Sequence, residues 1–194
     1  MKRIVIFASG SGTNAENIIK YFHERNIAEV THVFSNNLRA KVLKRAHDLK
    51  VKALHFDKTS FYQTNEVLNI LKDANPDVIV LAGFLWIFPK KIIDFFPNKV
   101  INIHPALLPK YGGKGMYGHH VHEAVVRNKE KESGITIHYV NEHYDEGGVI
   151  FQAKVAISEE NSAEDVANAI HALEYKHFPV VIEELLFSDK KSNE

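Results

Sequence analysis

The stretch "KVINIHPALLPKYGG", residues 99–113, begins as an apolar β-strand and stops at a proline. Side chains alternate between the two faces of a sheet, so Asn102 and His104 point one way while Ile101 and Ile103 point the other. Polar side chains at the carboxyl end of a strand are typical of the edge where open α/β sheets bind ligands. An amide can donate to an oxyanion and an imidazole can move a proton near neutral pH. We therefore interpret the pair as catalytic; the alternative is a pair that merely bonds to loop backbone.

Strands and helices alternate around this stretch. Runs rich in Val and Ile predict strands at 3–8, 30–35, 51–56, 77–82 and 99–104, and apolar residues at three- and four-residue spacing predict helices at 14–25, 39–49 and 61–73. Near-continuous apolar runs such as "VIVLAG" suit a parallel sheet that is covered on both faces. The fold class is therefore α/β, with a doubly wound, mainly parallel, Rossmann-like sheet.

The C-terminal part of the sequence has a different pattern. "GITIHYVN" (134–141) and "GVIFQAKVAI" (148–157) predict an antiparallel hairpin added to the sheet, and "SAED" (162–165) fits a capping box that opens a final helix. We expect one domain over residues 1–187 and a flexible tail over 188–194.

Composition excludes several functional classes. The 194 residues contain 24 Lys and Arg and 24 Asp and Glu, so the formal net charge is zero. This balance argues against a broad surface for nucleic acid or anionic lipid. The absence of cysteine excludes disulfides, thiolate metal sites and a cysteine nucleophile. Apolar runs are too short for a membrane span or a signal peptide, so we expect a cytoplasmic protein.

A glycine turn follows the first predicted strand, in "ASGSGTNAENI" (8–18). Gly10 and Gly12 permit a tight turn, and the start of the next helix offers N–H groups and a dipole that favour an anion. The turn lacks the lysine of a Walker A loop, and the second strand ends in "FSNN" instead of the acidic residue of a dinucleotide site. We favour a phosphate monoester as the ligand. The alternative is a plain β–α turn with Thr13 or Asn14 as N-cap.

Two further features carry candidate chemistry. "HYDEGGVI" (143–150) places the Asp145 carboxylate in the hairpin link, although this segment alone reads as an ordinary Asp–Gly turn. His119, His120 and His122 lie close together without the carboxylate spacing of a known metal site. We expect them at the start of a helix, and we expect no metal.

Together, "SGSGTN", "LAGF", "NIHPALLPKYGG" and "ITIHYVNEHYDEGGVIFQ" resemble the phosphoribosylglycinamide formyltransferases, a family of folate-dependent formyltransferases, in the family's order and over almost the whole chain. The resemblance implies a formyltransferase fold. It also implies transfer of a formyl group from 10-formyltetrahydrofolate, the co-substrate, to the amine of 5'-phosphoribosylglycinamide (GAR) in de novo purine biosynthesis, through a tetrahedral intermediate. Asn102 would hold the oxyanion and His104 would donate and accept the proton. Asp145 would pair with His104, oppose the effect of burial on its pKa and organise a water molecule.

The same resemblance implies binding residues for two small molecules. The GAR-binding residues would be Gly12, Thr13, Asn14, His171 and Glu174. The folate-binding residues would be Leu85, Trp86, Ile87, Phe88, Asn102, Asn141, Glu142, His143, Tyr144 and Asp145. The resemblance further implies a monomer or weak homodimer without nucleic-acid or membrane partners.

The sequence departs from the family in several places. Family members carry arginines near the start of the third helix and in the segment that matches "LWIF", whereas this chain has none between Arg45 and Arg127. Lys58, Tyr62 or backbone groups would have to replace them. The stretch "GGKGMYGHH" (112–120) is longer than the compact family form, and its glycines would allow a mobile flap.

Related functions are the competing interpretations. Methionyl-tRNA formyltransferases, formyltetrahydrofolate hydrolases and sugar-nucleotide formyltransferases share the chemistry but usually carry additional structure, for which we expect no counterpart here. From a different class, a nucleotide-binding regulatory module would use the glycine turn and would not need His104.

Overall fold

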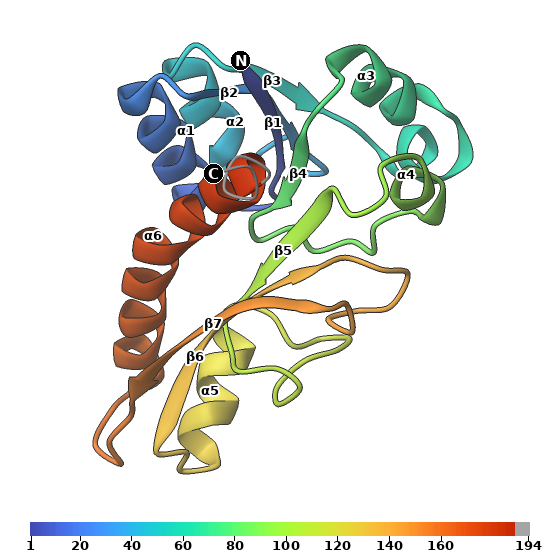
Figure 1. Ribbon diagram of the computed structural model, residues 1–194. Helices are drawn as coiled ribbons and strands as arrows, with labels where there is room; N and C mark the ends of the chain where they lie inside the picture. The colour runs from blue at the N-terminus through green and yellow to red at the C-terminus, as the bar shows by residue number, and fades with distance from the viewer. Residues whose placement is uncertain (189–194) are drawn as a thin grey trace.

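The computed structural model describes residues 1–188 of the chain. Within this part, seven strands form one sheet with helices on both of its faces (Figure 1). The strands are β1 (Lys2–Phe7), β2 (Ala28–Ser35), β3 (Lys52–His55), β4 (Val78–Leu81), β5 (Val100–His104), β6 (Glu132–Tyr139) and β7 (Val149–Ala156). The helices are α1 (Thr13–Arg25), α2 (Lys41–Asp48), the π-helical turn η1 (Thr59–Gln63), α3 (Glu66–Ala74), α4 (Lys90–Phe95), α5 (His119–Arg127) and α6 (Ala163–Phe187).

The strand order is β3-β2-β1-β4-β5-β6-β7. The first five strands run parallel, whereas β6 pairs antiparallel with β5 and β7 antiparallel with β6. This arrangement confirms the predicted doubly wound sheet with a C-terminal antiparallel hairpin. The chain order reverses direction between β1 and β4, and such a switch point opens a crevice at the carboxyl ends of the strands.

The alternation of apolar residues along β1 divides the core between the two faces of the sheet. Ile4 and Ile6 pack with α1, α2 and α6, while Val5 and Phe7 pack with α3 and α4. Figure 1 shows the same division, with α1 and α2 on one side of the sheet and α3 and α4 on the other. A sheet covered on both faces needs strands that are apolar throughout, which explains the continuous apolar runs in the sequence.

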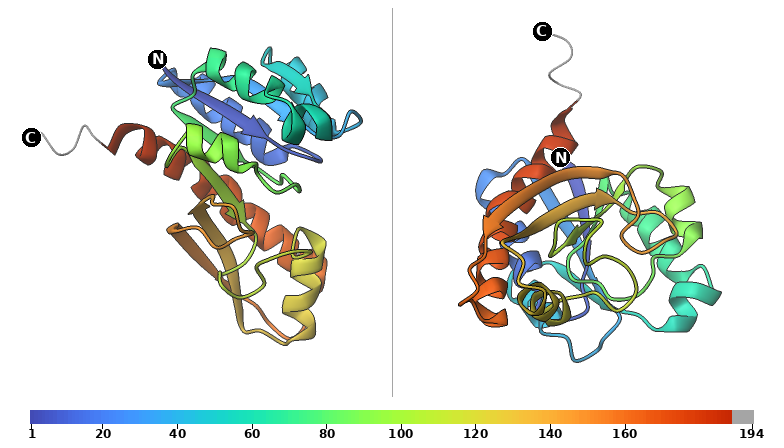
Figure 2. Two further views of the ribbon diagram at one scale, coloured as in Figure 1. Left: turned by 90° about the vertical axis from the view of Figure 1, so that its right-hand side faces the viewer. Right: turned by 90° about the horizontal axis from the view of Figure 1, so that it is seen from below.

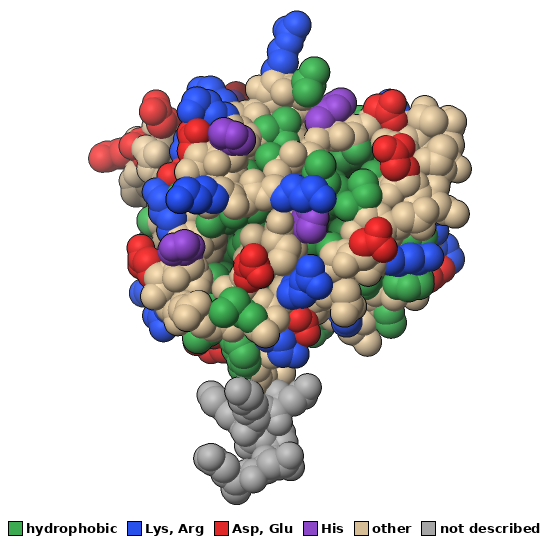
Figure 3. All heavy atoms as spheres, turned by 90° about the horizontal axis from the view of Figure 1, so that it is seen from above, with side chains coloured by type: hydrophobic (Ala, Val, Ile, Leu, Met, Phe, Trp, Pro, Cys, Tyr) green, Lys and Arg blue, Asp and Glu red, His purple; other side chains and the backbone are tan. Residues whose placement is uncertain are grey.

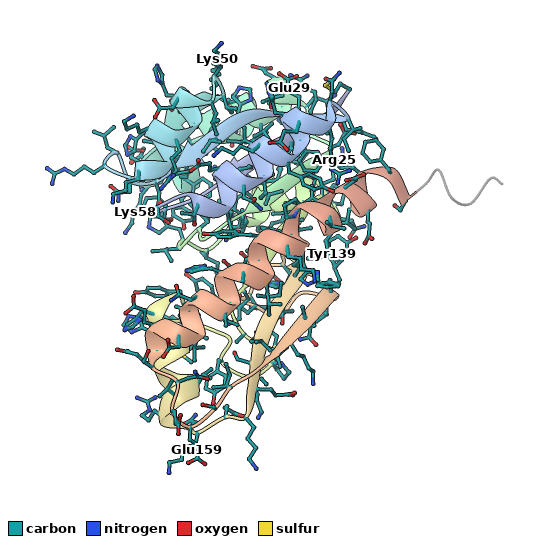
Figure 4. All side chains as sticks on the ribbon, turned by 90° about the vertical axis from the view of Figure 1, so that its left-hand side faces the viewer. Arg25, Glu29, Lys50, Lys58, Tyr139 and Glu159 are labelled. Carbon is teal, nitrogen blue, oxygen red and sulfur yellow. The ribbon has the colours of Figure 1, made fainter. Side chains whose placement is uncertain are left out.

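The final helix joins the parallel part of the sheet to the hairpin. It packs against α1, α5, β6 and β7, and Figure 4 shows it crossing this side of the molecule diagonally. It begins at the predicted capping box: Ser162 Oγ accepts from the N–H of Asp165 at 3.2 Å, and the N–H of Ser162 donates to Asp165 Oδ2 at 2.8 Å. These bonds satisfy backbone donors that would otherwise be unpaired at the helix start.

Two expectations from the sequence differ from the structure or lie outside it, and one helix was not expected. The predicted helix 61–73 is broken, because Thr64 is extended (φ −99°, ψ 178°) between η1 and α3. The apolar residues on both sides of the break face one core, which is why their spacing predicted a continuous helix. Helix α4 has six residues and is too short for periodicity to reveal it. The expected tail, 188–194, lies outside the described residues except for Ser188.

The surface shows charges of both signs. On the face drawn in Figure 3, Lys and Arg side chains are interspersed with Asp and Glu side chains, and neither sign forms a large patch. No helix among the described residues is long and apolar enough to cross a membrane.

The aromatic core around Phe7 gives a first test. Phe7 is fully buried, and five phenylalanine rings have centroids 4.8–6.1 Å from its own. Phe7→Ala should lower the free energy of unfolding by about 3–5 kcal/mol, measured by chemical denaturation, because it leaves a cavity in a packed core. Phe95→Ala is the matched control, since Phe95 is half exposed, and it should cost less than about 1 kcal/mol. Equal losses would contradict this assignment of the core.

Candidate active site

A cavity of about 620 Å³ lies at the carboxyl ends of β1, β4 and β5. Its wall consists of residues 9–14, 81–88, 102–105, 113–118, 138, 140, 141, 143–145 and the side chains of His122, His171 and Glu174. Every residue that the sequence assigns to the site lies in this wall except Glu142. The segment between β5 and α5, yellow-green in Figure 2, lies inside the curve of β6 and β7. Segments far apart in the chain therefore meet at one cavity.

Asn102 is oriented by a histidine on the neighbouring strand. The two residues lie opposite each other in the β5–β6 pair, and Asn102 Nδ2 is 3.1 Å from His138 Nε2. The other nitrogen, His138 Nδ1, is 2.8 Å from the carbonyl oxygen of Tyr139 and must donate to it. In the neutral imidazole, Nε2 therefore accepts from Asn102. The amide of Asn102 thus turns its NH₂ group toward Asp145, whose Oδ1 is 3.5 Å from Nδ2.

His104 is buried between a carbonyl group and a carboxylate. It is 3% exposed; its Nε2 donates to the carbonyl of Tyr111 at 2.7 Å, and its Nδ1 is 3.5 Å from Asp145 Oδ2. Burial lowers the pKa of His104 below its ordinary value, and the Asp145 carboxylate and the Tyr111 carbonyl oppose this shift without cancelling it. Asp145 thus opposes the effect of burial on the His104 pKa, as the sequence predicts, but the effect of burial is larger. Nδ1 is the nitrogen left to exchange a proton.

Asp145 is held in the hairpin link by three groups. Besides its contact with His104, it receives the N–H of Gly113 on Oδ2 at 3.0 Å, and its Oδ1 is 3.6 Å from His138 Nε2. Burial acts to raise the pKa of Asp145, but His138, His104 and the Gly113 N–H together hold it below its usual range. The link folds tightly onto β6: a Cβ at Gly147 would lie 1.6 Å from the carbonyl oxygen of Tyr139. Asp145 is therefore an anion at neutral pH, facing the imidazole.

The glycine turn after β1 is shaped by contact with α2. Gly12 has φ +74°, and a Cβ there would lie 2.3 Å from Cγ2 of Val42, so glycine alone fits without a shift. Gly12 is the N-cap of α1, and no side chain caps this helix. The alternative in which Thr13 or Asn14 is the N-cap is therefore wrong. The N–H groups of the first turn of α1 are left for an anion at the cavity.

A second cluster joins this turn to the last helix. Asn14 Nδ2 donates to Glu174 Oε2 at 2.8 Å, and His171 Nδ1 lies 2.9 Å from the same oxygen. The hydrogen bond to Glu174 raises the pKa of His171. The other side-chain atom of Asn14, Oδ1, is buried and has no hydrogen-bond partner within residues 1–188. This oxygen can accept a hydrogen bond from a ligand.

The segment "LWIF" contributes backbone and apolar surface to the cavity. The N–H of Leu85 donates to Ser9 Oγ at 3.0 Å, and the carbonyl of Ile87 accepts from Tyr62 Oη at 2.9 Å. Phe88 is buried in the aromatic core, whereas the side chains of Leu85 and Ile87 are exposed. The segment therefore both fills the core and lines the site.

Lys58 and Tyr62, the candidates for replacing the family's arginines, contact the segment "LWIF" from outside the cavity. Lys58 Nζ is 5.7 Å from the centre of the Trp86 ring, and Tyr62 bonds to the segment as described; Figure 4 labels Lys58. Neither residue lines the cavity. Among the described residues that do line it, Lys114 is the one Lys or Arg.

Two histidines that line the cavity, His122 and His138, were not predicted as site residues from the sequence. His138 carries a readable signal, because it shares a strand face with the polar Thr136 while Ile135 and Ile137 face the other way. His122 carries none beyond its place in the predicted helix start, which the structure confirms at His119.

His122 is a buried neutral imidazole. It is 3% exposed, and its Nδ1 has no hydrogen-bond partner in the part of the chain that the structure describes. Burial, helped by the nearby His171, lowers the pKa of His122 to about 4. Its neighbours His119 and His120 are exposed and lie 3.1 and 3.9 Å from Glu123. Across residues 1–188, no group of three or more His, Cys, Asp or Glu side chains could hold a metal ion.

An amide donor, a buried imidazole and a carboxylate thus surround one cavity beside a helix N-terminus that no side chain caps. These groups can stabilise an oxyanion and move a proton, as an α/β enzyme of acyl transfer requires.

Comparison with known proteins narrows this class. The family model described as formyl transferase matches residues 2–182. The phosphoribosylglycinamide formyltransferase of Haemophilus influenzae is 36% identical over 187 residues, which cover 94% of this chain and 86% of that protein. That of Bacillus subtilis is 32% identical over 191 residues, 96% of this chain and 95% of that protein. The crystal structure of glycinamide ribonucleotide transformylase 1 from Symbiobacterium toebii has a TM-score of 0.88 at 31% identity, covering 97% of this chain and 89% of that one. The chain therefore belongs to the formyl transferase family, among the phosphoribosylglycinamide formyltransferases.

His122 predicts a pH dependence of stability. Because its pKa is lower in the folded than in the unfolded chain, the unfolded chain binds the proton more readily below about pH 6.5. The contribution of neutral His122 to the free energy of unfolding should be complete above about pH 6.5. It should fall by up to about 3 kcal/mol as the pH drops through about 4. Chemical denaturation at several pH values should show that the free energy of unfolding falls less at acid pH for His122→Gln than for wild type. Identical pH slopes would contradict the prediction.

Proposed function

We propose that this protein transfers the formyl group of 10-formyltetrahydrofolate to the primary amine of GAR in de novo purine biosynthesis. The observation that carries this proposal is that a single cavity joins the glycine turn at 12–14 to Asn102, His104 and Asp145. The phosphate of GAR would lie at the turn and its amine beside the catalytic set. The names of the related proteins support the same acceptor.

The reaction forms one carbon–nitrogen bond and breaks another. The amine of GAR attacks the formyl carbon, and the carbonyl oxygen becomes an oxyanion in a tetrahedral intermediate. The NH₂ group of Asn102, already oriented by His138, would donate to this oxygen. The intermediate collapses when the bond from the formyl carbon to N10 of the folate breaks. One proton leaves the amine and one reaches N10, so no net proton is consumed.

His104 and Asp145 would handle this proton. The lowered pKa of His104 keeps the imidazole neutral and able to accept a proton at pH 7. The lowered pKa of Asp145 keeps a carboxylate ready to stabilise the imidazolium that then forms. A water molecule organised by Asp145 would link the amine to this pair.

The remaining predicted residues would divide between the two substrates. Glu174 and His171 would contact GAR beyond its phosphate, near the turn. The folate would lie between residues 85–88 and 141–145, where Leu85, Ile87 and Tyr144 are large apolar side chains with 37–45% exposure. Exposed apolar surface with nearby backbone polar groups suits a planar ring.

We also propose that residues 1–187 act as one formyltransferase domain. The protein would work in the cytoplasm as a monomer or weak homodimer, on small molecules alone, and without a metal, nucleic acid or membrane.

A direct assay tests the function. The purified protein should make formyl-GAR from GAR and 10-formyltetrahydrofolate, and His104→Ala should lower kcat by about 10²–10⁴-fold while largely keeping GAR affinity. A regulatory module would bind ligand without turnover in either form. The proposal fails if wild type makes no formyl-GAR under conditions where a folate analogue binds.

The glycine turn tests the phosphate assignment separately. Gly12→Ala would force Val42 and the turn apart, so we expect GAR affinity to fall at least about tenfold, or about 1.4 kcal/mol, with folate-analogue affinity unchanged. Gly10→Ala is the matched control, because a Cβ there meets no described atom within 4 Å. It should lower the GAR affinity less than Gly12→Ala does. Calorimetric titration measures both ligands. Equal losses of GAR and folate affinity for Gly12→Ala would reject the assignment.

A further inference from the structure

The middle of the loop between β5 and α5 is bonded to both His104 and Asp145. The carbonyl of Tyr111 accepts from His104 Nε2 at 2.7 Å, and the N–H of Gly113 donates to Asp145 Oδ2 at 3.0 Å. The same two side chains lie 3.5 Å apart, from Nδ1 to Oδ2. Residues 111–113 therefore fix the two partners relative to each other.

Local backbone preference does not explain the position of Tyr111. Its φ is +57°, a left-handed conformation that costs energy for a residue with a Cβ. The next residue, Gly112, is closely packed, since a Cβ there would lie 2.6 Å from Leu108 Cδ2. Contacts elsewhere must stabilise this backbone.

The phenol of Tyr111 supplies those contacts. Tyr111 Oη donates to Glu130 Oε1 at 2.9 Å and accepts from Asn128 Nδ2 at 2.8 Å. Glu130 is itself paired with Lys110 Nζ, at 3.1 and 3.3 Å. Asn128 and Glu130 directly follow α5, so the phenol ties the loop to the end of that helix. Burial, the largest influence, raises the pKa of Tyr111, which keeps the hydroxyl protonated and able to donate.

We propose that Tyr111 is a positioning residue: its phenol, bonded to Glu130 and Asn128, holds its own carbonyl against His104 and the following N–H of Gly113 against Asp145. Tyr111 does not line the cavity, so it acts through His104 and Asp145. The role in catalysis rests on the proposed formyl transfer, in which these two side chains move the proton.

The titration of His104 reports this role directly. The charged or titratable groups that act on His104 are Asp145 in the hairpin link, His138 on β6, Glu174 on α6 and His122 on α5. Removing the Tyr111 hydroxyl replaces none of these four groups, and it acts on His104 through the backbone of residues 111–113. The Tyr111 carbonyl stabilises the protonated imidazole, so its withdrawal should lower the pKa of His104. The limb of the pH–rate profile that belongs to His104 should move to lower pH.

The test is Tyr111→Phe in the full chain. We expect kcat for formyl transfer to fall about tenfold or more with KM for GAR unchanged, because ground-state binding does not use this contact. The NMR titration midpoint of the His104 imidazole should move to lower pH. The matched control is Tyr21→Phe, which also removes a tyrosine–glutamate bond, here to Glu183 at 2.5 Å between α1 and α6. It should leave kcat and the His104 midpoint unchanged.

Two further variants keep the test decisive. Glu130→Gln retains an oxygen acceptor for the phenol and should keep most of the activity. If Tyr111→Phe does not fold, Asn128→Ala is the substitute, because it removes one bond to the same phenol. It should lower kcat and the His104 titration midpoint in the same direction, but by less. The proposal is overturned if the variant that folds leaves the His104 midpoint where it is in wild type, whether or not kcat falls. The NMR titration does not require turnover. A wild-type chain that is inactive on GAR would therefore reject the proposed function, while the His104 midpoint would still test the positioning role.

Discussion

The antiparallel register of β6 on β5 is the constraint on which the site depends. Directly opposite residues in such a pair share a face of the sheet and lie close enough to interact. In this register Asn102 faces His138, and the amide is fixed by an imidazole whose other nitrogen is held by backbone. A slip by one residue would place an isoleucine or tyrosine opposite Asn102 and turn His138 to the other face. The orientation of the NH₂ group, and with it any oxyanion site, therefore follows from strand pairing.

The electrostatics of the site follow from the same geometry. His104 and Asp145 are both largely buried, and burial alone would make each of them neutral. The pKa of the carboxylate is nevertheless lowered, because His138 and His104 stabilise its charge once they are protonated and because it receives the Gly113 N–H. The pKa of His104 stays lowered, since burial outweighs the influence of Asp145. The result is a neutral base beside a fixed anion. A pair whose two pKa values are pushed apart in this way is suited to accepting and returning a proton.

The sequence predicts those features that depend on local pattern. Alternation places Asn102 and His104 on one face, the glycines after β1 mark the turn that lines the cavity, and "SAED" marks the start of α6. What it cannot predict is set by contacts between distant segments. The partner of Asn102 depends on register, which the hydrophobic pattern of the two strands does not fix by itself. The role of the Tyr111 carbonyl depends on a left-handed backbone and on Asn128 and Glu130, and nothing in "LLPKYGG" encodes either. The break at Thr64 is hidden because one apolar stripe continues across it.

The cavity wall offers little cationic charge to a phosphate at the turn after β1. The wall contains Asp145 and Glu174 but one cationic side chain, Lys114, among the described residues. A phosphate there would depend on backbone N–H groups and on the dipole of α1. That arrangement requires the turn to be fixed, and it is fixed from two sides. Val42 packs against Gly12, and Asn14 is bonded to Glu174, 160 residues further along the chain. Because α6 thereby supports the start of α1, this part of the cavity wall depends on contact between segments at opposite ends of the chain.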